Sequence, residues 1–322
     1  MSDEPKIKHR YYYFDPSVAA NSVFVVLFGI TAIGHTIQLI RKKTWYFIPF
    51  TIACYFEAIG YVGRALNASQ TPDWTFGPFL MQALLILLGP ALYAASVYMV
   101  LGRLIRLLDA HHLSIVRTNW LTKIFVAGDV VSFLVQGAGG GILSNAKTKK
   151  DQDLGNAVLL VGLAVQVVFF GLFIITTVLF HIRIIKKPTQ RSFSITAPWR
   201  QFILALYASS VLILIRSIFR MIEYGAGSDS VLQQSEAYLL ALDGALMFLV
   251  AVIFLWYHPH KILVGYKDAS GTDNEGGYHS RDGSRGEILP MGAPTRTLSA
   301  RDARAAKRAN EGTTAPQYGY AN

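Results

Sequence analysis

The side chains most able to do chemistry in this sequence are ionisable residues that stand inside long apolar stretches. Two trios recur at spacings of four and three residues, in EAIGYVGR and RSIFRMIE, which place each trio on one face of a helix. The trios are Glu57, Tyr61 and Arg64, and Arg216, Arg220 and Glu223. Four further polar residues stand singly in similar stretches, and they are Gln82, Asp129, Gln136 and Asp243. This mixture of signs indicates binding of a polar or charged group, and we assign no catalytic residue.

The elements that carry these residues are apolar runs long enough to cross a lipid bilayer. Hydrophobic residues make up 52% of the 322-residue chain, charged residues make up 16%, and the mean hydropathy is +0.35. A bilayer core of about 30 Å needs roughly 20 apolar residues in a helix. Seven runs meet this length: Val18–Ile40, Trp45–Leu66, Phe79–Leu101, Leu121–Leu143, Gly155–His181, Arg200–Ile222 and Ala237–Tyr257. The sequence therefore predicts an all-α, polytopic integral membrane protein with seven transmembrane helices.

Lysine and arginine in the short loops predict how the chain is oriented. Basic residues gather after the first, third and fifth runs, as in Arg41–Lys43, and such loops face the cytosol. The N-terminus is therefore expected outside and the C-terminus in the cytosol, although Lys6–Arg10 and Lys147–Lys150 lie on the outer side and weaken the bias. The first residues are too polar for a signal peptide, so the first run is expected to act as an uncleaved signal anchor.

This orientation assigns a depth to each buried charge, because a helix rises about 1.5 Å per residue. Arg216 and Asp243 fall in the outer half of the bilayer, and Glu57 falls near the midplane. A charge at the bilayer centre costs about 2.5–3.5 kcal/mol, so such residues need partners or water. The acids of this group can balance its bases, and we expect a polar, charge-balanced cavity that opens outward. The alternative interpretation is that these residues only hold helices together.

Three local features carry separate expectations. Asp129 and His35 fall deeper, toward the cytosolic side, where they could pair with each other. The glycines that follow Gln136, at 137 and 139–141, are expected to weaken their helix, and close helix packing or simple helix termination are the alternatives. Pro90 is expected to kink the third helix.

Charge and cysteine content define the remaining organisation. Residues 1–17 are expected to form an extracellular segment, residues 18–258 the transmembrane domain, and residues 259–322 a disordered, basic cytosolic tail. The net charge of +10 lies mostly in loops and tail, so it suits a membrane surface and not nucleic acid. The lone Cys54 excludes an intrachain disulfide and makes a thiolate metal site implausible. The sequon at Asn67 lies too close to the membrane for us to expect glycosylation.

The order of motifs on the seven runs resembles the fungal lipid-translocating exporter family, also described as the aminocholesterol-resistance family. The similarity runs from about Phe14 to Pro259. It is carried by Asp15-Pro16-Ser17 and Asn21; Glu57, Gly60, Tyr61 and Arg64; Gln82, Pro90, Ala94, Ala95, Tyr98 and Arg103; Asp129, Ser132 and Gln136; Gly162 and Gln166; Arg216, Phe219, Arg220 and Glu223; and Glu236, Tyr238, Asp243 and His258-Pro259.

This resemblance implies a plasma-membrane protein that moves sphingoid long-chain bases or similar amphipathic lipids and confers resistance to toxic lipids. One branch of the family is linked to porphyrin handling. The family brings no nucleotide-binding motif, and no P-loop pattern occurs here, so transport would be gradient-driven or passive. We therefore expect a lipid or other amphipathic small molecule as ligand, membrane lipids as surroundings, and neither a cofactor nor enzymatic activity.

Two other classes of function remain as alternatives. A seven-helix receptor or sensor of lipid stress fits the topology, although Leu101-Gly102-Arg103 stands where rhodopsin-like receptors have Asp-Arg-Tyr. An intramembrane lipid hydrolase would need convergent zinc ligands, and His35, His181, His258 and His260 all fall toward the cytosolic side. Histidines at helix ends are more often interfacial, so we expect no metal site.

Overall fold

The computed structural model describes residues 14–260, except for 72, 147, 196–197, 227–229, 231 and 233–234. The chain divides into two compact units, residues 1–271 and 272–322, and every described residue belongs to the first. The described residues are almost entirely helical and contain no strand. The predictions made for residues 1–13, for Lys147 and for most of the tail lie outside the described residues.

Seven helical segments are long and apolar enough to cross a membrane, as predicted. The first four are α1 (Val18–Lys42), α2 (Ile48–Ser69) with the short η1 (Trp45–Phe47) before it, α3 (Phe76–Leu107) and α4 (Thr118–Asn145). The others are α5 (Lys149–Lys186), α7 (Trp199–Gly225) and a seventh span made of α9 (Glu236–Leu239), η3 (Leu240–Ala245) and α10 (Leu246–Trp256). The short η2 (His111–Leu113) and α6 (Gln190–Ser194) lie between spans. The protein is an integral membrane protein, and the orientation of its termini stays a prediction.

Local signals explain where the helices begin and end. The side chain of Ser17 accepts a hydrogen bond from the Ala20 backbone and caps α1, whose last turn carries Arg41 and Lys42 at the negative end of the helix dipole. A capping box between Thr148 and Asp151 starts α5 six residues before the predicted start. With 38 residues, α5 is about 57 Å long and exceeds the hydrocarbon core of a bilayer.

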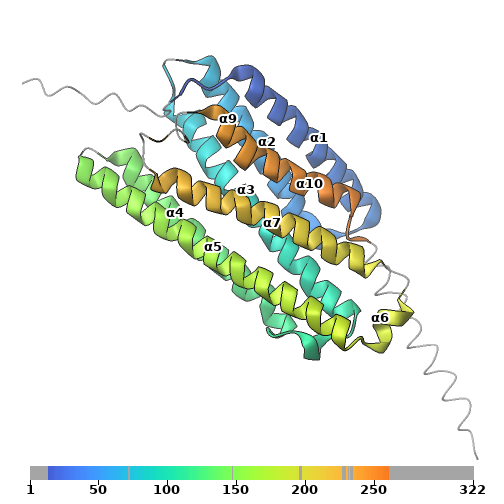
Figure 1. Ribbon diagram of the computed structural model, residues 1–322. Helices are drawn as coiled ribbons and strands as arrows, with labels where there is room; N and C mark the ends of the chain where they lie inside the picture. The colour runs from blue at the N-terminus through green and yellow to red at the C-terminus, as the bar shows by residue number, and fades with distance from the viewer. Residues whose placement is uncertain are drawn as a thin grey trace, which may run out of the picture. The chain divides into compact units, whose positions relative to one another are not determined.

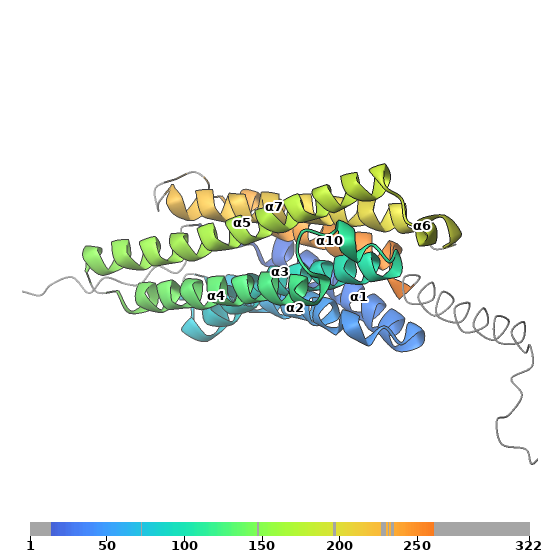
Figure 2. The same ribbon diagram turned by 90° about the horizontal axis from the view of Figure 1, so that it is seen from below.

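The helices form one bundle in which each span packs against its neighbours in sequence, and the seventh span returns to α1 (Figures 1 and 2). α3 lies inside this arrangement and contacts α2, α4, α5 and α7. α2, α3 and α7 bury more of their length than α1 and α4 do. Polar groups on α2, α3, α7 and the seventh span therefore meet in the interior.

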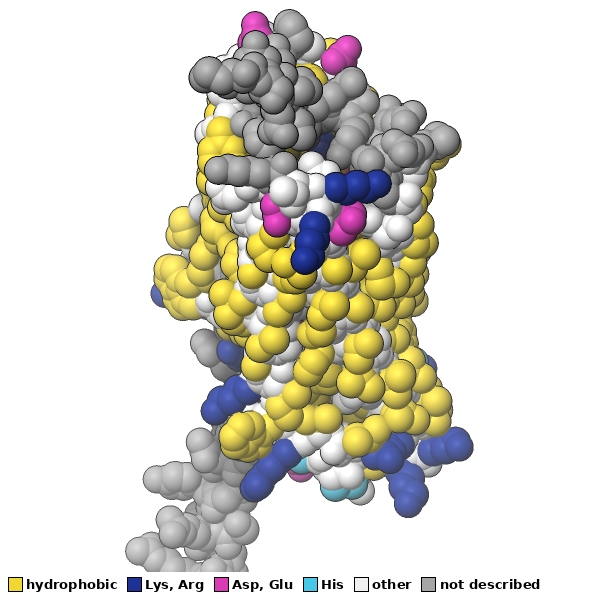
Figure 3. Space-filling model, turned by 90° about the vertical axis from the view of Figure 1, so that its left-hand side faces the viewer, with side chains coloured by type: hydrophobic (Ala, Val, Ile, Leu, Met, Phe, Trp, Pro, Cys, Tyr) yellow, Lys and Arg dark blue, Asp and Glu magenta, His cyan; other side chains and the backbone are white. Residues whose placement is uncertain are grey.

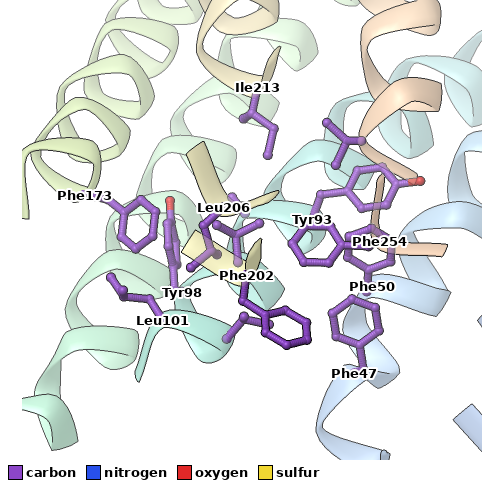
Figure 4. Close-up of a cluster of buried hydrophobic side chains, with 14 of the residues drawn as sticks. Phe47, Phe50, Tyr93, Tyr98, Leu101, Phe173, Phe202, Leu206, Ile213 and Phe254 are labelled. Carbon is purple, nitrogen blue, oxygen red and sulfur yellow. The ribbon is translucent and has the colours of Figure 1, made fainter. Parts of the chain in front are cut away.

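Aromatic and aliphatic side chains fill the core toward the end of the bundle where α10 ends (Figure 4). Phe47 and Phe50 stack with ring centroids 4.4 Å apart, and Phe254 packs 5.1 Å from Phe50. Tyr98 and Phe173 form a second group, 4.5 Å apart. On the face shown in Figure 3, apolar side chains form a wide band with charged side chains toward both ends, as expected of a surface in contact with lipid.

The structure bears on the expectations for the glycines of α4 and for Pro90 of α3. α4 stays helical through all four glycines and ends at Asn145, so it does not terminate at them, and the expected weakening stays a prediction. Close packing, one of the alternatives, holds at Gly139, where a Cβ would lie 2.6 Å from the backbone nitrogen of Leu159 in α5. A Cβ at Gly137, Gly140 or Gly141 would have no atom within 4 Å. α3 also continues as one helix from Phe76 to Leu107 with Pro90 inside it, and the kink expected at Pro90 stays a prediction.

Candidate functional site

The centre of the bundle holds a fully buried ion pair between α7 and the seventh span. Arg216 Nε donates to Asp243 Oδ1 at 2.5 Å, and the two side chains are 0% and 1% exposed. Arg216 Nη2 also donates to the backbone oxygen of Ile86 in α3, at 3.1 Å. Breaking a buried pair of this kind by removing one partner costs about 3–5 kcal/mol. Arg216 therefore ties three spans together at one point.

Pro90 explains why the Ile86 oxygen is available to Arg216. In a regular helix this oxygen accepts the N–H four residues later, which is position 90, and proline has no N–H. The freed carbonyl faces the core, where an unsatisfied polar group is costly. Arg216 supplies the missing donor, so α3 keeps its helical course while one of its carbonyls becomes a contact for another span.

Asp243 lies in η3, a six-residue π-helical turn inside the seventh span. Such turns are rare and occur frequently at functional sites. The next residue, Gly244, lies directly against the hydroxyl of Tyr61, and a Cβ at this position would collide with it. The Tyr61 ring stacks on Phe24 and Phe28 of α1, at 5.0 and 5.7 Å. The turn thus places Asp243 and Tyr61 side by side.

Glu57 of α2 completes this central group and has no hydrogen-bond partner for either carboxyl oxygen. It is 1% exposed, and it lies against Gly89 of α3, where a Cβ would be 2.5 Å from Glu57 Oε1. Asp243, Arg216 and Arg220 lie within electrostatic range of Glu57. We define Glu57, Tyr61, Arg216 and Asp243 as the central cluster. In the arrangement described, this cluster is packed and closed to solvent, and the predicted outward opening stays a prediction.

Two further ion pairs lie nearer the end of the bundle where α1 begins. Arg220 donates to Glu223 within α7 at 2.9 Å. Arg64 of α2 lies 3.5 Å from Glu236 at the start of the seventh span. Glu236 also accepts hydrogen bonds from the backbone nitrogen of Ser17 at 2.7 Å and from the Asn21 side chain at 2.8 Å.

Glu236 was missing from the predicted site residues. The sequence does offer a way to find it. Glu236 is an acidic residue in the first turn of the seventh span, on the side of the membrane where Arg64 is also expected. With this pairing, each arginine of the predicted group has a carboxylate partner, and the acids left over are Glu57 and, outside the central cluster, Asp129.

The remaining predicted site residues lie in other contacts. Gln136 donates to Ser132 in its own helix α4 at 2.6 Å and to Gln166 of α5 at 3.1 Å, while Ser132 donates to the Gly162 oxygen at 2.7 Å. This network joins α4 to α5. The side-chain oxygen of Gln82, in α3, has no partner.

The expected pairing of Asp129 with His35 is wrong. Asp129 lies within electrostatic range of Tyr98 of α3, and neither of its carboxyl oxygens has a hydrogen-bond partner. His35 Nε2 lies 3.0 Å from the backbone oxygen of Ala251, and its ring packs on Phe50. The depth estimate placed both residues toward the same side of the membrane but gave no information on which neighbours their helices have. α1 packs on α2 and α10, and α4 packs on α3 and α5.

His35 of α1 and the two histidines that follow α10 form a short row. The ring centroids of His35 and His258 are 6.4 Å apart, and those of His258 and His260 are 5.7 Å apart. His181 lies apart from this row and contacts Tyr207. Within the described part of the chain, no three His, Cys, Asp or Glu side chains group as ligands for a metal ion.

His258 is expected to make stability depend on pH. Burial, with smaller contributions from Lys42, His35 and His260, lowers the pKa of His258 to about 3. Its Nδ1 accepts the backbone N–H of His260, which also requires a neutral ring. An unfolded histidine titrates near 6.5, so below this pH the unfolded state binds a proton that the folded state does not. Stability from this group is complete above about pH 6.5 and is lost as the pH falls toward 3.

The expected loss at pH 5 is about 2 kcal/mol relative to pH 7.5. We expect the melting temperature in detergent to fall over this range in the wild type and to fall less in H258Q. Equal pH dependence in both proteins would contradict the assignment.

These features define a class: an integral membrane protein of seven helices whose buried charges form ion pairs that link its spans. The sequence profile described as "RTA1 like protein" matches residues 50–265, and the chain belongs to this family. The family expected from the motif order is therefore confirmed. No solved structure matches the chain.

Three relatives illustrate what the family contains. Protein RTA1 of Saccharomyces cerevisiae is 35% identical over 77% of this chain and 84% of its own length. Protoporphyrin uptake protein 1 of the same species is 34% identical over 76% of this chain and 90% of its own. The sphingoid long-chain base transporter RSB1 of S. cerevisiae strain Lalvin EC1118 is 27% identical over 76% and 72%. Two of these three relatives are thus named for the uptake or transport of a small molecule.

Proposed function

We propose that this protein moves an amphipathic lipid with a cationic head group, such as a sphingoid long-chain base, across the plasma membrane and so confers resistance to it. The observation that carries this proposal is Glu57, a buried acid without a hydrogen-bond partner beside the Arg216–Asp243 pair. A relative named as a sphingoid long-chain base transporter supports it. The proposal assigns no enzymatic step, and it places the N-terminus outside and the tail in the cytosol.

The chemistry of a sphingoid base suits this cluster. Its ammonium group supplies the positive charge and the hydrogen-bond donors that the Glu57 carboxylate lacks in the closed bundle. Its hydrocarbon tail can remain in lipid, since the outer surfaces of the spans are apolar. Asp243 is already held by Arg216, so we assign the contact with the amine to Glu57 and a supporting role to Asp243.

Replacing Glu57 by glutamine is expected to abolish movement of the base. A buried charge-assisted contact is worth roughly 2–5 kcal/mol, so the rate at limiting substrate should fall by more than about tenfold. The full-length protein, reconstituted in liposomes, would be tested for movement of labelled sphingosine, with D153N as the matched control because Asp153 is an exposed carboxylate on α5. Cells that express E57Q at normal levels should lose resistance to added sphingoid base.

The same liposomes allow a second candidate to be compared. A relative named for protoporphyrin uptake is more similar to this chain than the sphingoid base transporter is. Porphyrins carry carboxylates, and Arg216 Nη1 has no hydrogen-bond partner in the cluster. Labelled phosphatidylcholine and protoporphyrin should therefore be assayed beside sphingosine. Movement of the porphyrin alone would reassign the substrate, and movement of none of the three would favour a sensor.

A further inference from the structure

Glu57 is the charged residue of the central cluster that lacks an opposite partner. Arg216 and Asp243 neutralise each other, as do Arg220 and Glu223. A carboxylate at Glu57 would therefore add one uncompensated negative charge to a site that is closed to water, which is strongly unfavourable. The charge must be removed by a proton on the carboxyl group or balanced by a cation brought from outside.

The two arginines near Glu57 are already paired with other acids. Arg216 is fixed by its bonds to Asp243 and to the Ile86 oxygen. From α3, Glu57 faces Gly89 and Tyr93, and the Tyr93 hydroxyl donates to Cys54 Sγ at 3.3 Å. The other titratable groups within electrostatic range are Asp243 of the seventh span, Arg216 and Arg220 of α7, and Cys54 and Tyr61 of its own helix.

We propose that a proton and the cationic head group of the substrate exclude each other at Glu57, so that the protein exchanges one for the other. This inference rests on the proposed function. The step is balanced: the carboxylic acid and the ammonium ion give a carboxylate–ammonium pair and one proton, which leaves to water on the side toward which the cluster opens. The reverse step on the other side releases the amine and protonates Glu57. A proton gradient of the right sign then drives net movement of the base.

The test measures protons released when a cation binds. The probe is N,N,N-trimethylsphingosine, whose quaternary head group cannot lose a proton of its own. The purified full-length protein is titrated in a weakly buffered solution with a pH indicator. We expect about one proton released per probe bound, and an apparent affinity that weakens up to roughly tenfold for each pH unit of acidification. E57Q should release no proton and bind independently of pH, whereas E57D should retain the release.

Controls separate this proposal from a folding defect and from the proposed function. D153N should release protons as the wild type does. Cys54 is the sole cysteine and is buried, so a thiol-reactive dye reports whether E57Q is folded. Binding of the probe without proton release, or equal release from E57Q, would overturn the exchange alone. Failure to move sphingosine, in contrast, would contradict the proposed function.

Discussion

Replacing Arg216 by methionine is expected to destabilise the bundle by about 3–5 kcal/mol, a large fraction of the stability of an ordinary domain. The substitution removes both hydrogen bonds that the guanidinium makes. It leaves Asp243 as a buried, uncompensated charge and returns the Ile86 oxygen to the unsatisfied state that Pro90 imposes on it. Because Asp243 lies in the seventh span and Ile86 in α3, contacts of both spans with α7 should weaken together.

The measurement is thermal unfolding in detergent, followed by exposure of the buried Cys54 thiol to a reactive dye. R41M provides the control, because Arg41 is an exposed arginine at the end of α1 and its loss should change stability by less than about 0.5 kcal/mol.

A double-mutant cycle tests whether the pair itself is responsible. D243N alone should also destabilise, because it leaves the arginine charge buried. Removing both charges should cost less than the sum of the two single changes, since neither charge is then left uncompensated. Additive effects of R216M and D243N would show that the ion pair contributes little, and would contradict this account of the central cluster.

The number of spans could be predicted from the sequence because hydropathy and length are local properties. The ends of the spans were harder to predict from the sequence. Residues 149–153 carry four charges and read as a loop, yet they form the first turns of α5, started by the capping box between Thr148 and Asp151. That box is present in the sequence as a threonine followed three residues later by an acid, so this boundary could have been predicted from the capping pattern.

The central cluster could be predicted only in outline. Helical spacing and depth brought Glu57, Arg216 and Asp243 into one group, because these depend on position along each helix. The choice of partners depends on how the helices are rotated and which of them are neighbours. For this reason the Arg64–Glu236 pair was missed, and so was the use of the Ile86 oxygen by Arg216. That Pro90 frees this oxygen follows from the sequence, but the side chain that reaches it follows only from the packing.

Two adjacent glycines of α4 are expected to give opposite results when each is replaced by alanine. At Gly139, the new Cβ would lie 2.6 Å from the Leu159 nitrogen and 2.9 Å from the Gly155 oxygen, and both are backbone atoms of α5. Backbone cannot move aside as a side-chain tip can, so α4 and α5 would have to separate. Overpacking of this kind costs about 1–3 kcal/mol or more.

The separation would also stretch the hydrogen bonds that join the same two helices. These are the 2.7 Å bond from Ser132 to the Gly162 oxygen and the 3.1 Å bond from Gln136 to Gln166. A Cβ on Gly140, in contrast, would have no atom within 4 Å. There the change should stabilise the helix by roughly 0.5–1 kcal/mol, because alanine loses less backbone freedom than glycine on folding.

The same dye measurement on Cys54 should show a lower melting temperature for G139A and an unchanged or slightly higher one for G140A. Because the two positions are adjacent and share nearly the same depth in the membrane, a difference in depth cannot produce a change of sign. A similar decrease in both variants would mean that alanine weakens α4 at either position, and that close contact with α5 does not cause the loss of stability. A decrease in G139A alone would show that Gly139 is needed for the close packing of α4 on α5. This packing holds Gln136 and Gln166 in contact within the bundle.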